Sequence, residues 1–276
     1  MSIGVETLTT KDQSNTPGTG IASESCHYYD KQGNAVYEVP RAKGDGMRAT
    51  TLADARKLNL VPSVTTILAC AAKPGLEAWK AKQILEAALT LPRLPDETLD
   101  DYAARVIEDS KAQGKKAAER GTELHAAIED WIRGVQNLKW LDHCVKLNLT
   151  LQQYGIDITK GKPEHSFASP LGYGGKIDWH NDEIVLDFKT KANLESKRLA
   201  YDEHCWQLSA YAKGLTDERS HQFLNRPPIT RCANVFVGID DCTVRIHEWN
   251  EEDMDKAWRA FQALLSFWQI TKNYTP

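Results

Sequence analysis

Two aspartates and a lysine, Asp178, Asp187 and Lys189, occur in two short strand-like segments joined by a polar turn. Side chains alternate along a strand, so all three share one face of a hairpin centred on Asn181-Asp182. The two carboxylates would then be diagonal neighbours roughly 7 Å apart, close enough to hold one divalent cation. Such an ion can activate a bound water, and an ammonium beside it can orient that water. The alternative is an ordinary hairpin with solvated charges.

The two-residue turn also predicts which residues face one another. It places Asp178 opposite Val185 and Lys176 opposite Asp187. The other face collects apolar residues that we expect in the core, namely Ile177, Trp179, Ile184, Leu186 and Phe188. Burial of that face would leave the charged one open to a cleft.

The order of several motifs resembles the PD-(D/E)xK nuclease superfamily. GGKID, a turn and IVLDFKT are similar to its catalytic hairpin, with Asp178 as the first acid and residues 187–189 as the DxK element. VPSVTTIL, GTELHAAIE with His125, and WQLSAYAKG with Gln207 and Tyr211 follow the order of its RecB-like, phage-type exonuclease branch. This branch includes relatives of the mitochondrial genome maintenance exonuclease and Cas4-like nucleases.

The resemblance implies a mixed α/β (α+β) fold, with a restriction-endonuclease-like αβββαβ core and a helical N-terminal insertion or arch. It implies a metal held by His125, Asp178, Asp187 and the Phe188 carbonyl. Lys189 would then position the attacking water. Mg²⁺ is the expected ion, and Mn²⁺ would suit a histidine ligand equally, so the choice of metal stays open.

The remaining motif residues receive supporting roles. Gln207 and Tyr211 are one helical turn apart, and the resemblance implies that both bind the substrate. Core packing of Tyr211 with Gln207 on the surface is the alternative. Glu129, one turn after His125, and Glu164, on the preceding strand, are expected to support the site. A histidine on an amphipathic helix is otherwise more often a packed core residue.

Cysteine spacing gives no sign of a structural metal or cluster. The six cysteines contain no CxxC pair, so we expect reduced thiols at positions 26, 70, 144, 205, 232 and 242. Some relatives hold an iron-sulfur cluster through one early and three late cysteines. Only Cys232 and Cys242 lie late in this chain, and they are far apart, so we expect no iron-sulfur cluster.

Composition constrains the partners. The chain of 276 residues has a formal net charge of −4, whereas nucleic-acid binders are more often basic. Local basic groups at residues 111–120 and 189–198 nevertheless flank the proposed site, as a groove along a phosphate backbone would require. We found no membrane span, signal peptide or arginine-rich transit peptide, and therefore expect a cytoplasmic protein in a bacterial or phage-infected cell.

The expected function is that of a metal-dependent DNA exonuclease. It would hydrolyse phosphodiester bonds on single strands or strand ends during phage or bacterial recombination, replication or repair. Two alternatives remain: a structure-specific endonuclease of the same fold, and a nucleic-acid-binding scaffold without catalysis. Retention of both aspartates and the lysine on one face disfavours the scaffold.

Periodicity divides the chain into three parts. We expect a disordered tail over 1–24, a hairpin and short helix over 25–60, and a nuclease domain over 61–276. Its helical part covers about 61–155 and its catalytic core about 160–276. Three helices are predicted in the former, over 75–90, 97–121 and 122–134, and strands interrupted by one helix, then a closing helix, in the latter.

Overall fold

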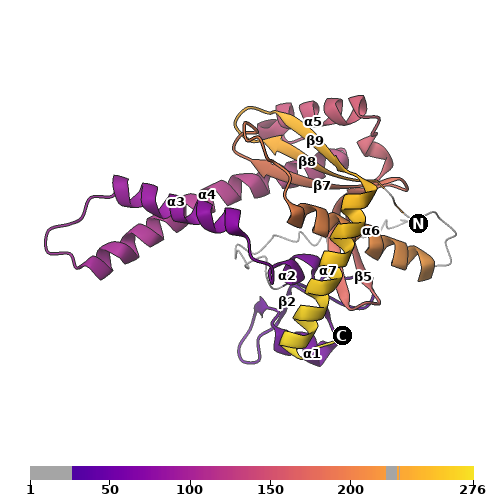
Figure 1. The fold of residues 1–276 in the computed structure, drawn as a ribbon, viewed down its shortest axis with the longest axis horizontal. Coiled ribbons are helices and arrows are strands. Elements are labelled where there is room, and N and C mark those ends of the chain that lie inside the picture. The colour runs from indigo at the N-terminus through magenta and orange to yellow at the C-terminus, as the bar shows by residue number, and fades with distance from the viewer. Residues whose placement is uncertain (1–26, 222–228, 230) are drawn as a thin grey trace, which may run out of the picture.

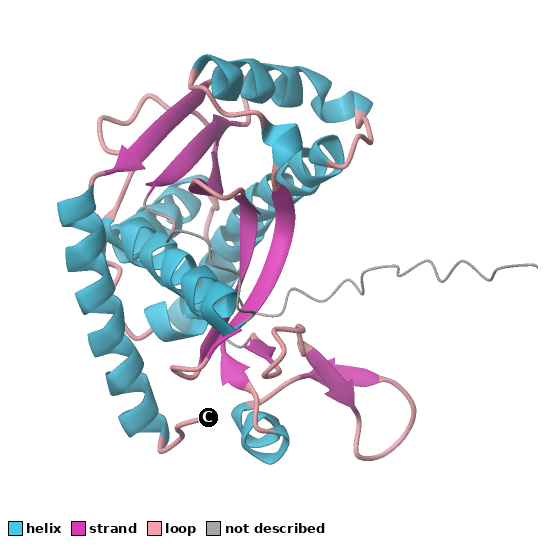
Figure 2. Cartoon of the chain, turned by 90° about the vertical axis from the view of Figure 1, so that its right-hand side faces the viewer, coloured by secondary structure: helices cyan, strands magenta, loops and turns pink. Residues whose placement is uncertain are grey.

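The computed structural model describes residues 27–221, 229 and 231–276. The predicted disordered tail, 1–24, lies outside them. Within them the fold is mixed α/β, as predicted: a five-stranded sheet packs between helices, and a helical arm projects from this body (Figures 1 and 2). Among these residues no helix is both long and apolar enough to cross a bilayer.

The central sheet has the strand order β5-β6-β7-β8-β9. Its strands are β5 (Lys162–Ser169), β6 (Tyr173–His180), β7 (Ile184–Lys191), β8 (Arg231–Gly238) and β9 (Val244–Trp249). Only β7 and β8 are parallel, and α6 (Asp202–His221) connects them, because parallel neighbours require a crossover. With a helix before β5, this is the predicted αβββαβ arrangement.

Alternating side chains give the sheet two apolar faces. Val185 and Cys232 join a core with α2 (Val64–Leu68), α6 and α7 (Glu251–Lys272). Leu186 and Ala233, one residue further along their strands, join a second core with two helices on the other face. Those helices are α4 (Leu99–Ile132) and α5 (Leu141–Gln153).

The N-terminal part docks against β5 and β6. It contains β1 (Tyr28–Tyr29), β2 (Glu38–Pro40), β3 (Met47–Ala49), α1 (Leu52–Leu58), β4 (Val61–Pro62) and α2. The predicted hairpin at 27–39 reduces to a single bridge, Tyr29 to Ala35, because β1 pairs with β4 and β2 with β3. Ser63 caps α2 by accepting from the Thr66 amide.

A two-helix arm stands out from the body (Figure 1). It consists of α3 (Pro74–Thr90) and the distal half of α4. Two separate helices were predicted over 97–134, and this was wrong, since α4 is continuous for 34 residues. Gly121 does not end the helix. A β-carbon there would lie 2.7 Å from the Thr190 hydroxyl oxygen, so the glycine instead lets α4 approach β7.

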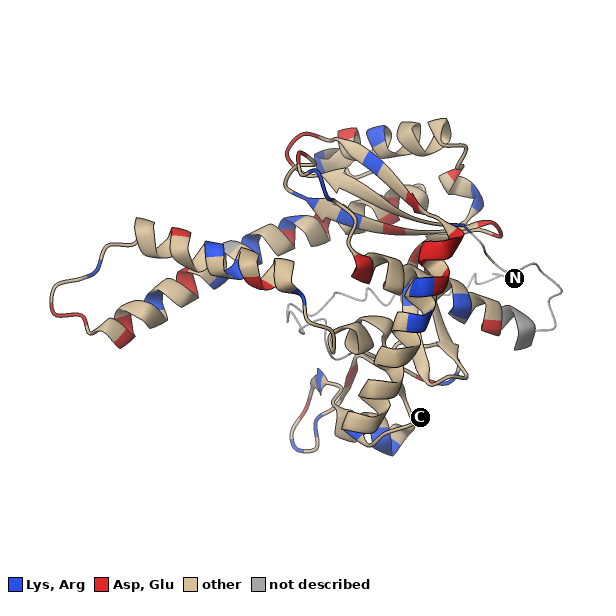
Figure 3. Cartoon of the chain, viewed as in Figure 1, with Lys and Arg blue, Asp and Glu red and all other residues tan. Residues whose placement is uncertain are grey.

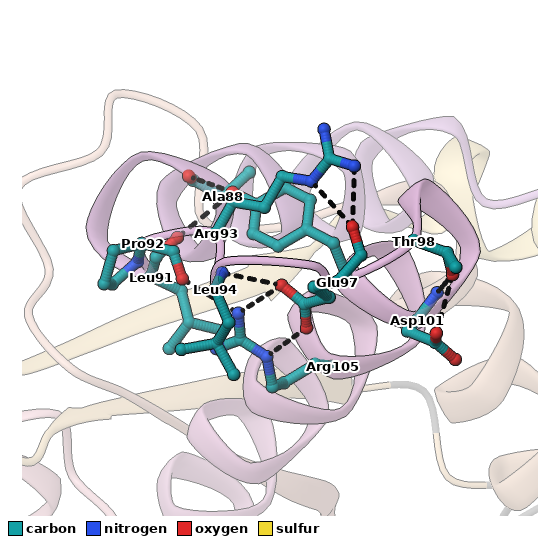
Figure 4. Close-up of polar contacts among 10 residues, drawn as sticks. Ala88, Leu91, Pro92, Arg93, Leu94, Glu97, Thr98, Asp101 and Arg105 are labelled. Atoms are coloured by element: carbon teal, nitrogen blue, oxygen red, sulfur yellow. Dashed lines mark hydrogen bonds and ion pairs between the residues drawn. The ribbon is translucent and has the colours of Figure 1, made fainter.

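The tip of the arm is fixed by a local hydrogen-bond network (Figure 4). The Glu97 carboxylate accepts from the Arg105 guanidinium at 2.9 Å and from the Leu94 amide at 3.0 Å. The Tyr102 hydroxyl donates to the Ala88 carbonyl at 2.8 Å, and Thr98 caps α4. The turn between α3 and α4 is therefore held by side chains at both of its ends.

Helix α5 was not predicted, although its buried positions have helical spacing. They are His143, Cys144, Leu147 and Leu151. Two short 3₁₀ segments, Leu138–Trp140 and Ile158–Lys160, flank this helix. Residues with weak helix propensity, such as Asn148 and Thr150, obscure the pattern, and packing on the sheet overrides them.

Candidate metal centre

The hairpin that carries both aspartates opens into a fork. Strands β6 and β7 pair only at Trp179–Leu186 and His180–Val185. The predicted register was therefore wrong by two residues, since His180 and not Asp178 lies opposite Val185. The turn is longer than expected because the Asn181 side chain accepts from the Glu183 and Ile184 amides, each at 2.8 Å.

A register shift of two residues does not change the face of the sheet on which each side chain lies, so Asp178 and Asp187 remain on one face. Beyond the two pairs, the Phe188 amide donates to Asp178 Oδ2 at 2.7 Å instead of continuing the ladder. Of the five residues predicted on the apolar face, Trp179, Ile184, Leu186 and Phe188 lie in the core beneath α4 and α5. Ile177 is buried in the opposite core, because β6 diverges from β7 at this point.

Three side chains that can bind metal meet at this fork. His125 on α4, Glu164 on β5 and Asp178 on β6 each offer a ligand atom, and these atoms lie within 4.8 Å of one another. His125 Nε2 is 3.4 Å from Asp178 Oδ1. Glu164 has a left-handed backbone, at φ 53°, and forms an ion pair with Lys176. Lys176 thus lies beside the site and pairs with Ser166 in the ladder, not with Asp187.

Charges in this group perturb one another. Burial acts to lower the pKa of His125, but the adjacent Asp178 carboxylate outweighs burial and the net pKa is raised. Burial acts to raise the pKa of Asp178, but the His125 and Lys189 charges hold it below its ordinary value. Burial raises the pKa of Glu164 even though Lys176 opposes this. A half-buried group of carboxylates with one histidine is an environment that a divalent cation would stabilise.

Asp187 lies at the centre of a second set of hydrogen bonds. Its Oδ1 accepts from Lys189 Nζ at 3.0 Å and its Oδ2 from Asn234 Nδ2 at 2.7 Å. The carboxylate is 1% exposed, and burial raises its pKa to about 6, with Lys189 opposing and Asp178 reinforcing the shift. Asp187 therefore sits next to the group of His125, Glu164 and Asp178 with both oxygens already bonded.

Asn234 and Trp249 are residues that the sequence did not reveal. Asn234 pairs with Asp187 across the parallel ladder and is fully buried. Its Oδ1 accepts from Trp249 Nε1 at 2.7 Å, which orients the amide so that its NH₂ group faces Asp187. No motif signals this contact, whereas Lys176 was already placed on the charged face by the alternation along β6, although with the wrong cross-strand partner.

Gln207 and Tyr211 form a chain that ends at Lys189. Gln207 Oε1 accepts from Lys189 Nζ at 3.1 Å, and Gln207 Nε2 donates to the Tyr211 hydroxyl at 2.9 Å. Tyr211 is buried, with its ring edge-on to Phe167. Tyr211 is therefore packed in the core, as the alternative interpretation expected. The hydrogen bond of Gln207, in contrast, holds the Lys189 ammonium in position. Glu129 is half-buried and ion-paired with Arg133, one turn from His125.

Comparison with known proteins leaves the family unassigned. No protein-family model and no curated protein matches the chain. Among solved structures, a candidate exonuclease from Eubacterium rectale is similar at 10% identity and a TM-score of 0.41, covering 56% of this chain and 68% of its own. The protein SSO0001 is similar at 16% identity and a TM-score of 0.31, covering 73% and 88%.

Proposed function

We propose that the protein is a metal-dependent nuclease that hydrolyses phosphodiester bonds in DNA. The observation that carries this proposal is the meeting of His125, Glu164 and Asp178 beside the buried Asp187–Lys189 pair. One helix and three consecutive strands, α4, β5, β6 and β7, supply these groups, whereas an ion pair with a purely structural role would need only two of them. The resemblance of the motifs adds to this support.

The donor set fits a hard divalent cation such as Mg²⁺ or Mn²⁺. Two carboxylates and one imidazole would hold the ion, which when bound would acidify a water and stabilise charge on the phosphate. Asp187 and the Phe188 carbonyl are the further ligands that we propose. Glu164 was expected only to support the site, and its position now makes it a proposed ligand.

Lys189 is placed to act on the nucleophile. Asp187 and Gln207 fix its ammonium from two sides, so its positive charge is held where it can act on a water or on a phosphate oxygen. Asn234 keeps Asp187 in place, which in turn keeps Lys189 in place. Gln207 and Tyr211 are thus proposed to position Lys189, with substrate contact by Gln207 as an additional role.

A cleavage assay tests the proposal. End-labelled single- and double-stranded DNA would be incubated with Mg²⁺, Mn²⁺ or EDTA, and we expect degradation with metal only. Asp187→Asn should abolish cleavage and leave DNA binding largely intact, because phosphate contacts come mainly from Lys and Arg. Asp255→Asn, an exposed site on α7, is the matched control and should cleave normally. Cleavage by Asp187→Asn at the wild-type rate would exclude the proposed catalytic role.

The type of cleavage is a separate proposal. An exonuclease acting on single strands or ends follows from the resemblance, and recombination, replication or repair in phage or bacteria is the corresponding setting. The arm projects away from the body (Figure 1), whereas an arch that admits only strand ends would have to close over the metal centre, and this favours the endonuclease alternative. Closed single-stranded circles decide between them: an exonuclease leaves circles intact while it degrades the linear strand, whereas an endonuclease nicks both.

A further inference from the structure

A second lysine follows Lys189 on the same face of β7. Residues two apart on a strand point the same way and lie about 7 Å apart, so Asp187, Lys189 and Lys191 form one row. That spacing is of the order of the separation between neighbouring phosphates along a nucleic-acid strand. Lys191 has no carboxylate within 4.0 Å in the part of the chain that the structure describes, whereas Lys189 is bonded to Asp187.

The segment after β7 folds back over the sheet and builds a wall beside Lys191. Leu194 and Leu199 pack on Phe236, which is buried and pairs with Lys189 in the ladder. This packing places the Tyr201 ring 5.2 Å from Lys191 Nζ, and the Phe236 ring lies 5.9 Å from the same atom. The ammonium therefore lies over two aromatic rings, with its stem held in one position.

His204, at the start of α6, presents a hydrogen-bond donor to this wall. Its ring is edge-on to Tyr201 at 5.6 Å, and its Nδ1 accepts from the Tyr201 amide at 3.3 Å. Burial, with Lys189, Lys191 and Lys73 adding to it, lowers the pKa of His204 to about 3, so the imidazole is neutral. A neutral ring that accepts at Nδ1 carries its proton on Nε2, where none of the described residues accepts it.

These groups leave a local excess of positive charge. Lys73 begins the arm at the N-cap of α3, acts on His204, and has no ion-pair partner among the described residues. Glu203 acts on Lys191 but lies beyond ion-pair distance. Three hydrogen-bond donors therefore lack an anionic partner among the described residues, on the side toward which the row of Asp187, Lys189 and Lys191 continues. They are the ammonium groups of Lys73 and Lys191 and Nε2 of His204.

We infer that Lys191 and His204, walled by Tyr201 and with Lys73 nearby, form a subsite for a backbone phosphate adjacent to the scissile one. This inference rests on the proposed nuclease function and extends it to the path of the substrate strand. The strand would run along β7 from the metal centre toward the base of the arm. Tyr201 would offer an aromatic surface to the neighbouring base.

The test is the salt dependence of DNA binding. A fluorescently labelled single strand of twelve deoxythymidines is titrated with the full chain in Ca²⁺ at several NaCl concentrations, and the strand is recovered afterwards to verify that it is uncut. Lys191→Met keeps the aliphatic stem on the aromatic rings but removes the charge. Lys256→Met, at an exposed lysine of α7 outside both basic groups, is the matched control, and Lys191→Arg keeps the charge.

Loss of one phosphate contact has a defined signature. Lys191→Met should raise Kd roughly three- to tenfold. It should also reduce the slope of log K against log salt by about 0.7. Lys256→Met and Lys191→Arg should leave the slope unchanged. In cleavage assays KM should rise while kcat stays the same, because Lys191 does not contact the proposed metal ligands.

The two proposals fail in different ways. If the wild type cleaves no DNA with Mg²⁺ or Mn²⁺, the proposed nuclease function is excluded. The DNA-binding data would still test the phosphate subsite. An unchanged slope and Kd in Lys191→Met, or a change equal to that of Lys256→Met, would overturn the subsite. So would a wild type that does not bind the strand.

Discussion

The hydrogen bonds of Asn234 make Asp187 sensitive to a substitution outside every recognised motif. Asn234→Leu keeps the approximate volume of the side chain and removes both of its polar atoms. Asp187 Oδ2 then loses a 2.7 Å donor, and Trp249 Nε1 loses its acceptor. Asn234 is 0% exposed, so water does not readily replace either contact.

The size of the effect follows from the charge on Asp187. A hydrogen bond to a charged group contributes about 1.5–3 kcal/mol, and an orphaned buried donor costs about 1–3 kcal/mol, so the variant should lose about 3–5 kcal/mol of unfolding free energy at pH 8. With its pKa at about 6, Asp187 is mostly protonated at pH 5. A bond to a neutral acceptor contributes about 1 kcal/mol, so the loss at pH 5 should be smaller by about 1–2 kcal/mol.

The sign of this pH dependence is fixed by the direction of the shift. The pKa of Asp187 is raised on folding, so ionisation opposes folding and stability falls as pH rises from about 4 to about 6. Removing the Asn234 donor raises that pKa further and extends the decline above pH 6. Urea unfolding of the metal-free protein in EDTA at pH 5 and pH 8 measures both losses. Equal losses at the two pH values would contradict a charge-assisted bond from Asn234.

Three further outcomes are expected. Glu164→Gln should weaken Mn²⁺ binding at least tenfold in titration calorimetry, because it removes a proposed ligand. Glu123→Gln, at an exposed position of α4, is the control and should bind Mn²⁺ normally. Equal Mn²⁺ affinities of Glu164→Gln and the wild type would exclude Glu164 as a ligand. Wild-type Mn²⁺ affinity should fall about tenfold for each unit of pH per displaced proton, because His125 must lose its proton and Asp187 must ionise. The fall should begin above pH 6, because the pKa of His125 is raised from its ordinary value of 6.5, and it should steepen below the Asp187 pKa of about 6. A flat profile between pH 5 and 7 would contradict this. Gly214→Ala should lower the free energy of unfolding in urea by about 1–3 kcal/mol, because its β-carbon would lie 1.9 Å from the Phe167 ring. Gly114→Ala should raise it by about 0.5–1 kcal/mol, because its β-carbon would lie 3.5 Å from Trp79, in ordinary contact, and alanine favours the helix.

Local patterns in the sequence were sufficient for most of the elements and for the face that carries Asp178 and Asp187. Alternation along β6 and β7 correctly grouped Asp178 and Asp187, because parity survives an even error in register. The register itself depended on the Asn181 side chain, which bonds two amides of the turn and lengthens it. A two-residue turn was the simpler expectation, and the sequence carries no sign of that contact.

Long-range placement was harder to predict. Glu164 belongs to the metal-capable group only because β5 pairs with β6 and its backbone turns left-handed at that residue. Asn234 reaches Asp187 through a parallel pairing made across the whole of α6. Both depend on which strands become neighbours, and no local periodicity encodes that choice.

One unbroken helix carries both the arm and a proposed metal ligand. Between Leu99 at the tip and His125 at the fork, α4 extends over roughly 40 Å without a proline, so it behaves as a stiff lever. Its fulcrum lies where Gly121 contacts Thr190 on β7. A small rotation of the arm about that point would shift His125 against Asp178. A force that displaces the tip would therefore also displace His125 relative to the other proposed metal ligands. A metal ion bound by these ligands would in return restrain the arm.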